Sequence, residues 1–182
     1  MRSPRLVLLL VTLAIAVYIP VLAFPFIATS YIEIPVSRVL GSWHQVPALL
    51  GNANWHFRLT YVFANSWLVQ WFGFEPPPFY VTSLCLHAVG VWLIYEMGRW
   101  KALSYKASAW AAGFFAIYEG HHSAVMLLAA WPDLLAAIFA CAAFLFWIRW
   151  LQSGSLIGYF GAFLPFVMAL LSSESGFLVT VL

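Results

Sequence analysis

The segment FYVTSLCLHAVGVWLIYEM, residues Phe79–Met97, decides the fold class of this chain. Its only charged residue is Glu96, one position before its end. The segment is long enough to cross a hydrocarbon core, which needs about 20 residues. The 182-residue chain is 64% hydrophobic and 8% charged, with a mean hydropathy of +0.92. Soluble domains carry about 25% charged residues. The composition therefore excludes a soluble globular fold and predicts an all-α, polytopic transmembrane helical bundle.

Further apolar segments predict additional spans on both sides of Phe79–Met97. Residues 6–28 are interpreted as an uncleaved anchor, and the alternative is a signal peptide cleaved after Ala23. The later spans are expected at residues 104–119, 133–151 and 156–171, with the start of another at 176–182. Because no polar tail follows, we expect residues 1–182 to be a single membrane domain from the N-terminal part of a longer protein.

Residues 29–78 form the most polar region and are predicted to be an external loop with interfacial helices. Within this region Ile34, Val39, Leu40 and Trp43 are expected to form the apolar face of one short interfacial helix. Leu59–Phe74 is expected to lie at the membrane without crossing it. The run Glu75-Pro76-Pro77-Pro78 is expected to break the chain before the next span, since proline cannot continue a helix.

The basic residues predict the orientation, because cytoplasmic loops carry an excess of lysine and arginine. If Leu59–Phe74 does not cross, only two basic residues lie outside, Arg38 and Arg58. The others lie inside: Arg2, Arg5, Arg99, Lys101, Lys106 and Arg149. We therefore expect a multi-pass protein with a cytoplasmic N-terminus, most simply in a bacterial inner (plasma) membrane. On the inside, Arg99 is expected to pair with Glu96 three residues earlier.

The same orientation gathers most acids and histidines on the external side, which is where we expect the chemistry. Glu33 is the only acid soon after the first span and is the candidate general base. The stretch from Tyr118 to Asp133 supplies more candidates, namely Glu119, His121, His122 and Asp133. Glu174 and Arg58 complete the external set, because a guanidinium suits phosphate recognition. His87, within Phe79–Met97, is a candidate because ionisable groups inside spans often mark function.

Each candidate also has a structural interpretation. Glu33 could be a solvated carboxylate paired with Arg38, and Asp133 or Glu174 could simply stabilise a helix start. His87 could be a neutral packing histidine, and Arg58 could extend to the interface. No cofactor is predicted. No metal is predicted either, since adjacent histidines seldom bind one ion in common, although a divalent metal stays an alternative. Cys85 and Cys141 read as small core residues. Scattered basic residues do not indicate nucleic acid.

Several blocks in order resemble the C-type superfamily of integral-membrane glycosyltransferases, which use polyprenyl-phosphate sugars. The pattern is similar to protein O-mannosyltransferase-like and tetratricopeptide-associated membrane proteins. The blocks are Phe57-Arg58-Leu59-Thr60-Tyr61, Phe72-Gly73-Phe74, Leu84-Cys85-Leu86-His87, Tyr118 to His122, Asp133-Leu134-Leu135-Ala136-Ala137 and Leu171-Ser172-Ser173-Glu174. The sequence departs from the family pattern after the first span, where Glu33 replaces one or two catalytic aspartates. It also departs at Leu59, Ser123 and Ser173.

The resemblance implies transfer of a sugar from a polyprenyl-phosphate donor to an acceptor on the external face, as in protein glycosylation of the cell envelope. The expected partners are this lipid-linked donor and membrane lipids; the sequence leaves the oligomeric state open. Glu33 would be catalytic, and the other external candidates with His87 would bind substrate. The alternative is a non-catalytic membrane protein: a transporter, a scaffold or an inactive diverged copy. We find no internal repeat of the kind a transporter would favour.

Overall fold

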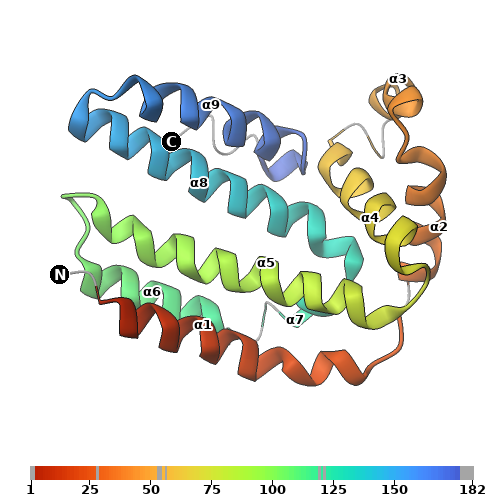
Figure 1. Ribbon diagram of the computed structural model, residues 1–182, viewed down its shortest axis with the longest axis horizontal. Coiled ribbons are helices and arrows are strands. Elements are labelled where there is room, and N and C mark those ends of the chain that lie inside the picture. The colour runs from red at the N-terminus through yellow and green to blue at the C-terminus, as the bar shows by residue number, and fades with distance from the viewer. Residues whose placement is uncertain are drawn as a thin grey trace.

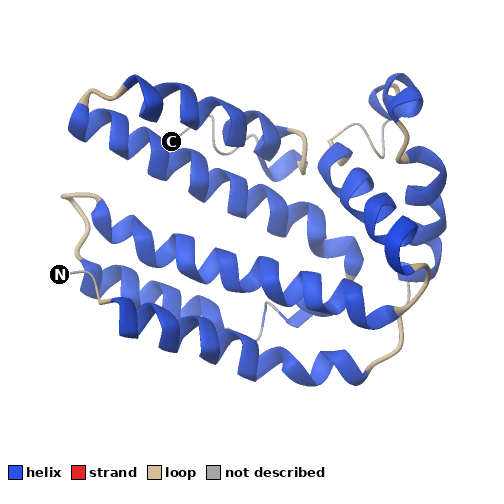
Figure 2. Cartoon of the chain, viewed as in Figure 1, coloured by secondary structure: helices blue, strands red, loops and turns tan. Residues whose placement is uncertain are grey.

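The computed structural model describes residues 3–27, 29–52, 55, 57–118, 120 and 122–176, and every regular element there is a helix (Figure 2). The α-helices are α1 Pro4–Tyr18, α2 Ser30–Leu40, α3 Val46–Leu50, α4 Leu59–Phe72, α5 Pro76–Glu96, α6 Tyr105–Ile117, α7 His122–Met126, α8 Trp131–Ser153 and α9 Leu156–Leu170. Short 3-10 helices are η1 Ile19–Ala23, η2 Trp43–Gln45, η3 Met97–Arg99 and η5 Leu128–Ala130. The all-helical class predicted from the sequence is confirmed.

Three helical segments in the described chain are long and apolar enough to cross a membrane: Pro4–Ala23, Pro76–Arg99 and Leu128–Ser153. α6 and α9 have 13 and 15 residues. They coincide with two further predicted spans but are shorter than the roughly 20 residues that an upright crossing needs. α6 ends early because Tyr118 adopts an extended backbone, with φ −65° and ψ 120°.

The helices α1, α5, α6, α8 and α9 lie side by side as a bundle, and α2, α3 and α4 form a separate group at one end of it (Figure 1). α5 packs against α1, α6 and α8, while α9 packs on α8. α4 is inclined to the long helices and packs mainly on α2 (Figure 1). The segment that we expected not to cross is therefore placed outside the bundle of long helices.

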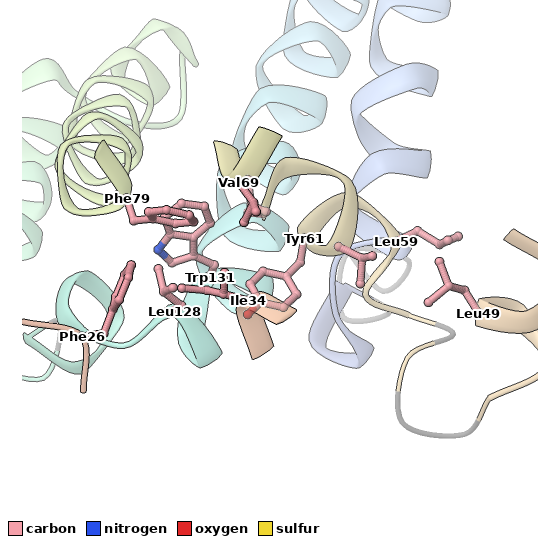
Figure 3. Packing of buried hydrophobic residues seen from close by; sticks show 11 residues of the cluster. Phe26, Ile34, Leu49, Leu59, Tyr61, Val69, Phe79, Leu128 and Trp131 are labelled. Carbon is pink, nitrogen blue, oxygen red and sulfur yellow. The ribbon is translucent and has the colours of Figure 1, made fainter. Parts of the chain in front are cut away.

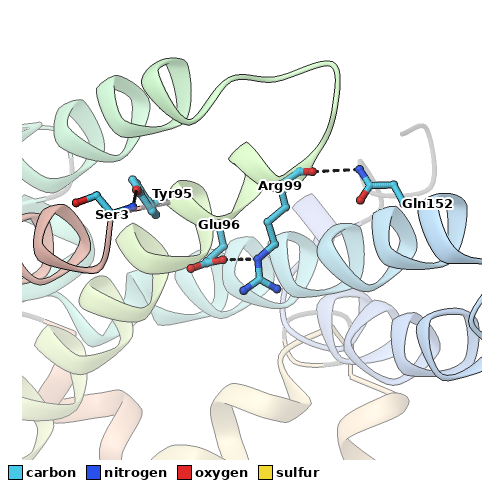
Figure 4. Close-up of polar contacts among 5 residues, drawn as sticks. All are labelled: Ser3, Tyr95, Glu96, Arg99 and Gln152. Carbon is cyan, nitrogen blue, oxygen red and sulfur yellow. Dashed lines mark hydrogen bonds and ion pairs between the residues drawn. The ribbon is translucent and has the colours of Figure 1, made fainter. Parts of the chain in front are cut away.

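The opposite end of the bundle carries the start of α1 and the ends of α5 and α8 (Figure 1). There the Ser3 backbone N–H donates to the Tyr95 hydroxyl over 3.0 Å, and Gln152 Nε2 donates to the Arg99 carbonyl oxygen over 3.1 Å (Figure 4). The predicted pair of Glu96 and Arg99 is confirmed, with 2.5 Å between Arg99 Nε and Glu96 Oε2. Of the basic residues that the orientation argument grouped, Arg5, Arg99 and Arg149 lie near these ends of α1, α5 and α8, whereas Arg2 lies outside the described residues.

Proline and glycine set the limits of α5 and α8. The expected break at Glu75–Pro78 is corrected: α5 begins at Pro76, so the prolines form its first turn. A first turn accepts proline because its N–H groups have no intrahelical acceptor. α8 starts as expected, with Pro132 and Asp133 in its first turn, although Trp131 already belongs to it. α8 ends at Ser153, and Gly154, which follows it, has a φ of +63° that favours glycine.

The expected end of the first span needs correction. Its helix ends at Ala23 rather than residue 28, and its last turn is a 3-10 helix containing Pro20, which cannot donate a helical hydrogen bond. α2 is the helix expected after it. Ile34 is fully buried, whereas Val39 and Trp43 are 68% and 80% exposed. Ile34 is buried because this side of α2 faces α4.

A core of aromatic and aliphatic residues joins α2, α4 and the bundle (Figure 3). Trp131 is fully buried at its centre, and its indole N–H donates to Ser83 Oγ of α5 over 2.7 Å. The rings of Tyr61 and Phe79 each lie 6.5 Å from the Trp131 ring. Burying a side chain of this size removes a large apolar area from water. Trp131 therefore fixes α4 against the starts of α5 and α8.

Candidate functional site

A seam of polar side chains fills the contact between α2 and α4. These side chains recur every three or four positions, which places them on one side of each helix. Ser30, Ser37 and Asn65 are fully buried there. The seam consists of Ser30, Glu33 and Ser37 on α2 with Arg58, Tyr61 and Asn65 on α4, Arg58 being the residue that precedes the first turn. A buried polar stripe between helices indicates either a binding site or a hydrogen-bonded packing contact.

The α2–α4 seam is closely packed where α2 ends. A Cβ added to Gly41 would lie 2.1 Å from Ser66 Cβ and 2.7 Å from the Ser37 carbonyl oxygen. Real Cβ atoms do not approach other atoms this closely, so the seam needs glycine at this position. The close approach brings the polar stripes of α2 and α4 together.

Glu33 and Tyr61 are joined by a direct hydrogen bond, in which the Tyr61 hydroxyl donates to Glu33 Oε2. Glu33 is half-buried and Tyr61 is buried. Burial is the main reason why the pKa of Tyr61 lies well above its usual value, and the charge and hydrogen bond of Glu33 add to the rise. Asn65 and the positive charge of Arg58 act in the opposite direction. Tyr61 is therefore a permanent hydrogen-bond donor that holds Glu33 in place.

Several other polar atoms of the seam are buried without a hydrogen-bond partner among the described residues. They are Arg58 Nε, Ser30 Oγ and Ser37 Oγ. Leaving a buried donor or acceptor unpaired costs about 1–3 kcal/mol. The seam therefore combines the carboxylate of Glu33 with an unpaired guanidinium nitrogen of Arg58, whose charge also acts on Tyr61, and with hydroxyl and amide groups.

Thr60, the neighbour of Tyr61, joins α4 to the chain that follows α9. Its backbone N–H donates to the Leu171 carbonyl oxygen over 3.2 Å, and its hydroxyl donates to Ser172 Oγ over 2.7 Å. Ser172 in turn donates to the Met168 carbonyl oxygen. The first turn of α4 thus lies between α2 on one side and the end of α9 on the other.

Asp133 anchors the turn that follows α9 to the start of α8. Its Oδ1 accepts the hydroxyl hydrogens of Ser173, over 2.6 Å, and of Ser175, over 2.9 Å. Ser173 is buried, whereas Asp133 and Ser175 are exposed. The carboxylate also lies in the first turn of α8, where the helix dipole stabilises negative charge. Asp133 is therefore placed as the tie between two chain segments at one end of the bundle.

For the remaining external candidates the structure gives only the chain segment and the exposure of each side chain. Glu174 is exposed in the turn that holds Ser173 and Ser175, and His122 is exposed at the start of α7. Glu119 and His121 lie outside the described residues. The structure thus brings Glu33 and Arg58 together through Tyr61, and it places Glu174 near Asp133 through the neighbouring serines.

His87 lies on a different surface of α5, between α1 and α6. Its ring stacks on Phe115 with centroids 5.2 Å apart and meets the edge of Tyr18 at 5.0 Å. Its Nε2 lies 3.4 Å from the Ala116 carbonyl oxygen. His87 is fully buried among these aromatic rings. These surroundings favour the interpretation of His87 as a neutral histidine that packs between helices.

No group of three or more His, Cys, Asp or Glu side chains within the described ranges is arranged to hold a metal ion. The polar groups that the seam does offer are a carboxylate, hydroxyls, an amide and a guanidinium. Such a set suits hydrogen bonding to sugar hydroxyls and to phosphate oxygens.

Sequence reasoning missed most of the residues that surround Glu33. Tyr61 and Asn65 follow Arg58 by three and seven positions, and Ser30 and Ser37 flank Glu33 at the same helical spacing. This periodic polar stripe in two otherwise apolar helices was a signal that could have identified them. Thr60, Ser173 and Ser175 gave no such signal, because they act through contacts between distant segments.

The sequence matches no protein-family model, and the comparisons with curated proteins and with solved structures found no significant match either.

Proposed function

We propose that the protein is an integral-membrane glycosyltransferase, or the N-terminal part of one, that uses a polyprenyl-phosphate sugar as its donor. The proposal takes the three long apolar segments as membrane spans of a polytopic bundle, with the α2–α4 end on the external side. The observation that carries it is the hydrogen bond of Tyr61 to Glu33, with the buried and unpaired Nε of Arg58 in the same seam. A fixed carboxylate and a permanent cation are the two groups that this reaction needs.

In the proposed reaction Glu33 takes the proton of an acceptor hydroxyl as its oxygen attacks the anomeric carbon of the donor sugar. The bond between that carbon and the phosphate oxygen breaks, and the electron pair leaves with the polyprenyl phosphate. Arg58 stabilises the negative charge gained by the leaving phosphate. Tyr61 positions the carboxylate of Glu33 through its hydrogen bond.

The exposed side of α4 supports a location at the membrane surface. Trp67 and Trp71 are 65% and 72% exposed on this helix, and Phe72 is 50% exposed. Tryptophan is enriched where the acyl chains of a membrane meet the headgroups. An α4 lying at this depth would present the seam to the phosphate of a lipid whose chain stays in the bilayer.

The decisive measurement is consumption of lipid-linked sugar by membranes that contain the full-length protein. Glu33→Gln should reduce turnover by about 100-fold or more, because general-base catalysis contributes a factor of about 100 to 10,000. Glu75→Gln is the matched control, since Glu75 is an exposed acid at the start of α5. Unchanged turnover on Glu33→Gln would remove the catalytic assignment.

Arg58 is tested in the same assay. Arg58→Ala should slow turnover more than Arg58→Lys, which keeps the charge but loses the forked donor geometry. Arg38→Ala is the control, because Arg38 is an exposed arginine at the far end of α2. Equal losses in Arg58→Ala and Arg38→Ala would show that surface charge, rather than the seam, controls the activity.

The second candidate function is a non-catalytic membrane protein, and the close packing of the seam favours it. Ser30, Ser37 and Asn65 have no exposed surface, and Gly41 leaves no space beside Ser66. Small and polar residues between helices are also how packed membrane helices are held together. An absence of turnover with every lipid-linked sugar tested, in a folded protein, would support this alternative.

A further inference from the structure

A cavity of about 730 Å³ lies between α5 and α8, at the end of the bundle away from the α2–α4 seam. Its walls are mostly apolar and come from Trp92 and Leu93 on α5 and from Ala142, Leu145 and Phe146 on α8. Its polar residues all lie toward one end of these two helices: Glu96, Arg99, Arg149, Gln152, Ser153 and Ser155. The cavity thus has an apolar part and a polar part arranged along the helices.

The polar part carries a net positive charge. Arg99 and Arg149 contribute two positive charges, and Glu96 contributes one negative charge. The Glu96 side chain is only 2% exposed and contacts Arg99, whose side chain stays 52% exposed (Figure 4). Arg149 is exposed, and no acid in the described part of the chain pairs with it. Arg149 therefore presents an uncompensated cation at the mouth of the cavity.

The mouth of the cavity is also held in shape. Gln152 Nε2 donates to the Arg99 carbonyl oxygen over 3.1 Å, which ties the end of α8 to the end of α5 (Figure 4). Ser153 donates to the Arg149 carbonyl oxygen over 2.6 Å. The bond of Gln152 therefore links the two helix ends that carry the arginines, and the bond of Ser153 lies within the last turn of α8.

We propose that this cavity binds one acidic phospholipid, with its phosphate at Arg149 and Arg99 and its acyl chains along the apolar walls. The proposal rests on the membrane placement proposed above, and it does not depend on sugar transfer. Basic pockets between membrane helices on the cytoplasmic side are suited to anionic headgroups. The arrangement along α5 and α8 matches the order of headgroup and acyl chain in one leaflet. The charge of the cavity selects an acidic lipid over a zwitterionic one.

The test is native mass spectrometry of the full-length protein reconstituted with equal amounts of phosphatidylglycerol and phosphatidylcholine. The wild type should retain phosphatidylglycerol severalfold more than phosphatidylcholine. Arg149→Gln should abolish that preference, and Arg149→Lys should keep part of it. Lys101→Gln is the matched control, because Lys101 is an exposed cation near the same end that does not line the cavity.

A second variant tests the apolar part without altering charge. Ala142→Phe fills the space beside Leu145 and should lower retention of both lipids while leaving Arg149 in place. Equal retention of both lipids by the wild type would overturn the proposal. It would also be overturned if Lys101→Gln removed the preference as fully as Arg149→Gln does. Sugar turnover is measured separately, so failure of the lipid site and failure of the transferase are distinguishable.

Discussion

The Tyr61 hydroxyl donates its hydrogen to the carboxylate of Glu33, joining α4 to α2 across 28 residues of sequence. Tyr61 is buried and Glu33 is half-buried, so the bond lies at the edge of the seam. A hydrogen bond to a charged group contributes more than one between neutral groups. The position of Glu33 therefore depends on a residue of the neighbouring helix as well as on α2 itself.

Tyr61→Phe should destabilise the protein by about 1–2 kcal/mol, because it removes the hydrogen bond and keeps the packing of the ring. Thermal or denaturant unfolding in detergent measures the change. Tyr159→Phe is the control, since Tyr159 is exposed on α9 and its hydroxyl can be replaced without loss of a buried bond. Equal stability of Tyr61→Phe and the wild type would show that the hydrogen bond contributes nothing.

The cost of Tyr61→Phe should depend on pH, since the pKa of Tyr61 is raised in the folded protein by burial and then by Glu33. Tyr61 lies in α4, outside the three candidate spans. Above about pH 10 the unfolded chain releases the phenolic proton, whereas the folded chain retains it. The stabilisation is fully present below that pH and is lost as the pH rises.

The advantage of Tyr61 over phenylalanine should therefore shrink by up to about 1.4 kcal/mol per pH unit above pH 10. Unfolding of the wild type and of Tyr61→Phe at about pH 8 and about pH 11 measures this difference, and other titrating groups cancel in the comparison. A penalty that stayed constant between the two conditions would contradict the raised pKa.

Gly41→Ala should separate the two helices of the seam. The added Cβ would lie 2.7 Å from the backbone oxygen of Ser37 and even closer to Ser66, so α2 must move. Overpacking of this kind costs about 1–3 kcal/mol. Gly51→Ala is the matched control, because the nearest atom to its new Cβ is 3.4 Å away. If both variants unfold at the same temperature, the close approach at Gly41 is not needed.

Asp133→Ala should cost about 1–2 kcal/mol, through the loss of hydrogen bonds from Ser173 and Ser175 and of charge at the start of α8. Asp133→Asn should cost less, because its carbonyl oxygen still accepts. Ser173→Ala should be more costly than Ser175→Ala, since Ser173 is buried and Ser175 is exposed. A double-mutant cycle of Asp133 with Ser173 should give a coupling energy of at least about 0.5 kcal/mol. Independent effects would contradict the direct bond.

Local signals predicted those features that depend on neighbouring residues. Pro132 and Asp133 marked the start of α8, and the spacing of Glu96 and Arg99 predicted their ion pair. The bond of Glu33 to Tyr61 and that of Asp133 to Ser173 were not predictable in this way, because each joins segments that are distant in the sequence.

The side of α2 that faces the rest of the protein could not be predicted for the same reason. Val39 and Trp43, which we expected on the apolar face of an interfacial helix, are exposed, whereas Ile34 is buried. The true contact uses small polar residues, Ser30 and Ser37, that let α4 approach. Only the position of α4 decides which side of α2 is covered. Polar residues at helical spacing therefore indicate the contact face of a helix as well as apolar residues do.

The ion pair of Glu96 and Arg99 should respond unequally to loss of its two partners. Glu96 is 2% exposed and Arg99 is 52% exposed at the side chain. Glu96→Gln leaves an arginine that can turn to water, so it should cost less than about 1 kcal/mol. Arg99→Gln takes the arginine away from a carboxylate that is buried and cannot turn to water, so it should cost more, about 3 kcal/mol.

The double variant Glu96→Gln with Arg99→Gln separates the cost of losing the ion pair from the cost of keeping a charge on the buried Glu96. It should be more stable than Arg99→Gln alone, because it removes the buried charge that the single variant leaves behind. Unfolding of all four proteins in the same detergent completes the cycle. If Arg99→Gln were no less stable than Glu96→Gln, burial of the Glu96 carboxylate would not control the energy of this pair. Arg99 could then be altered in the lipid cavity without disturbing the end of α5.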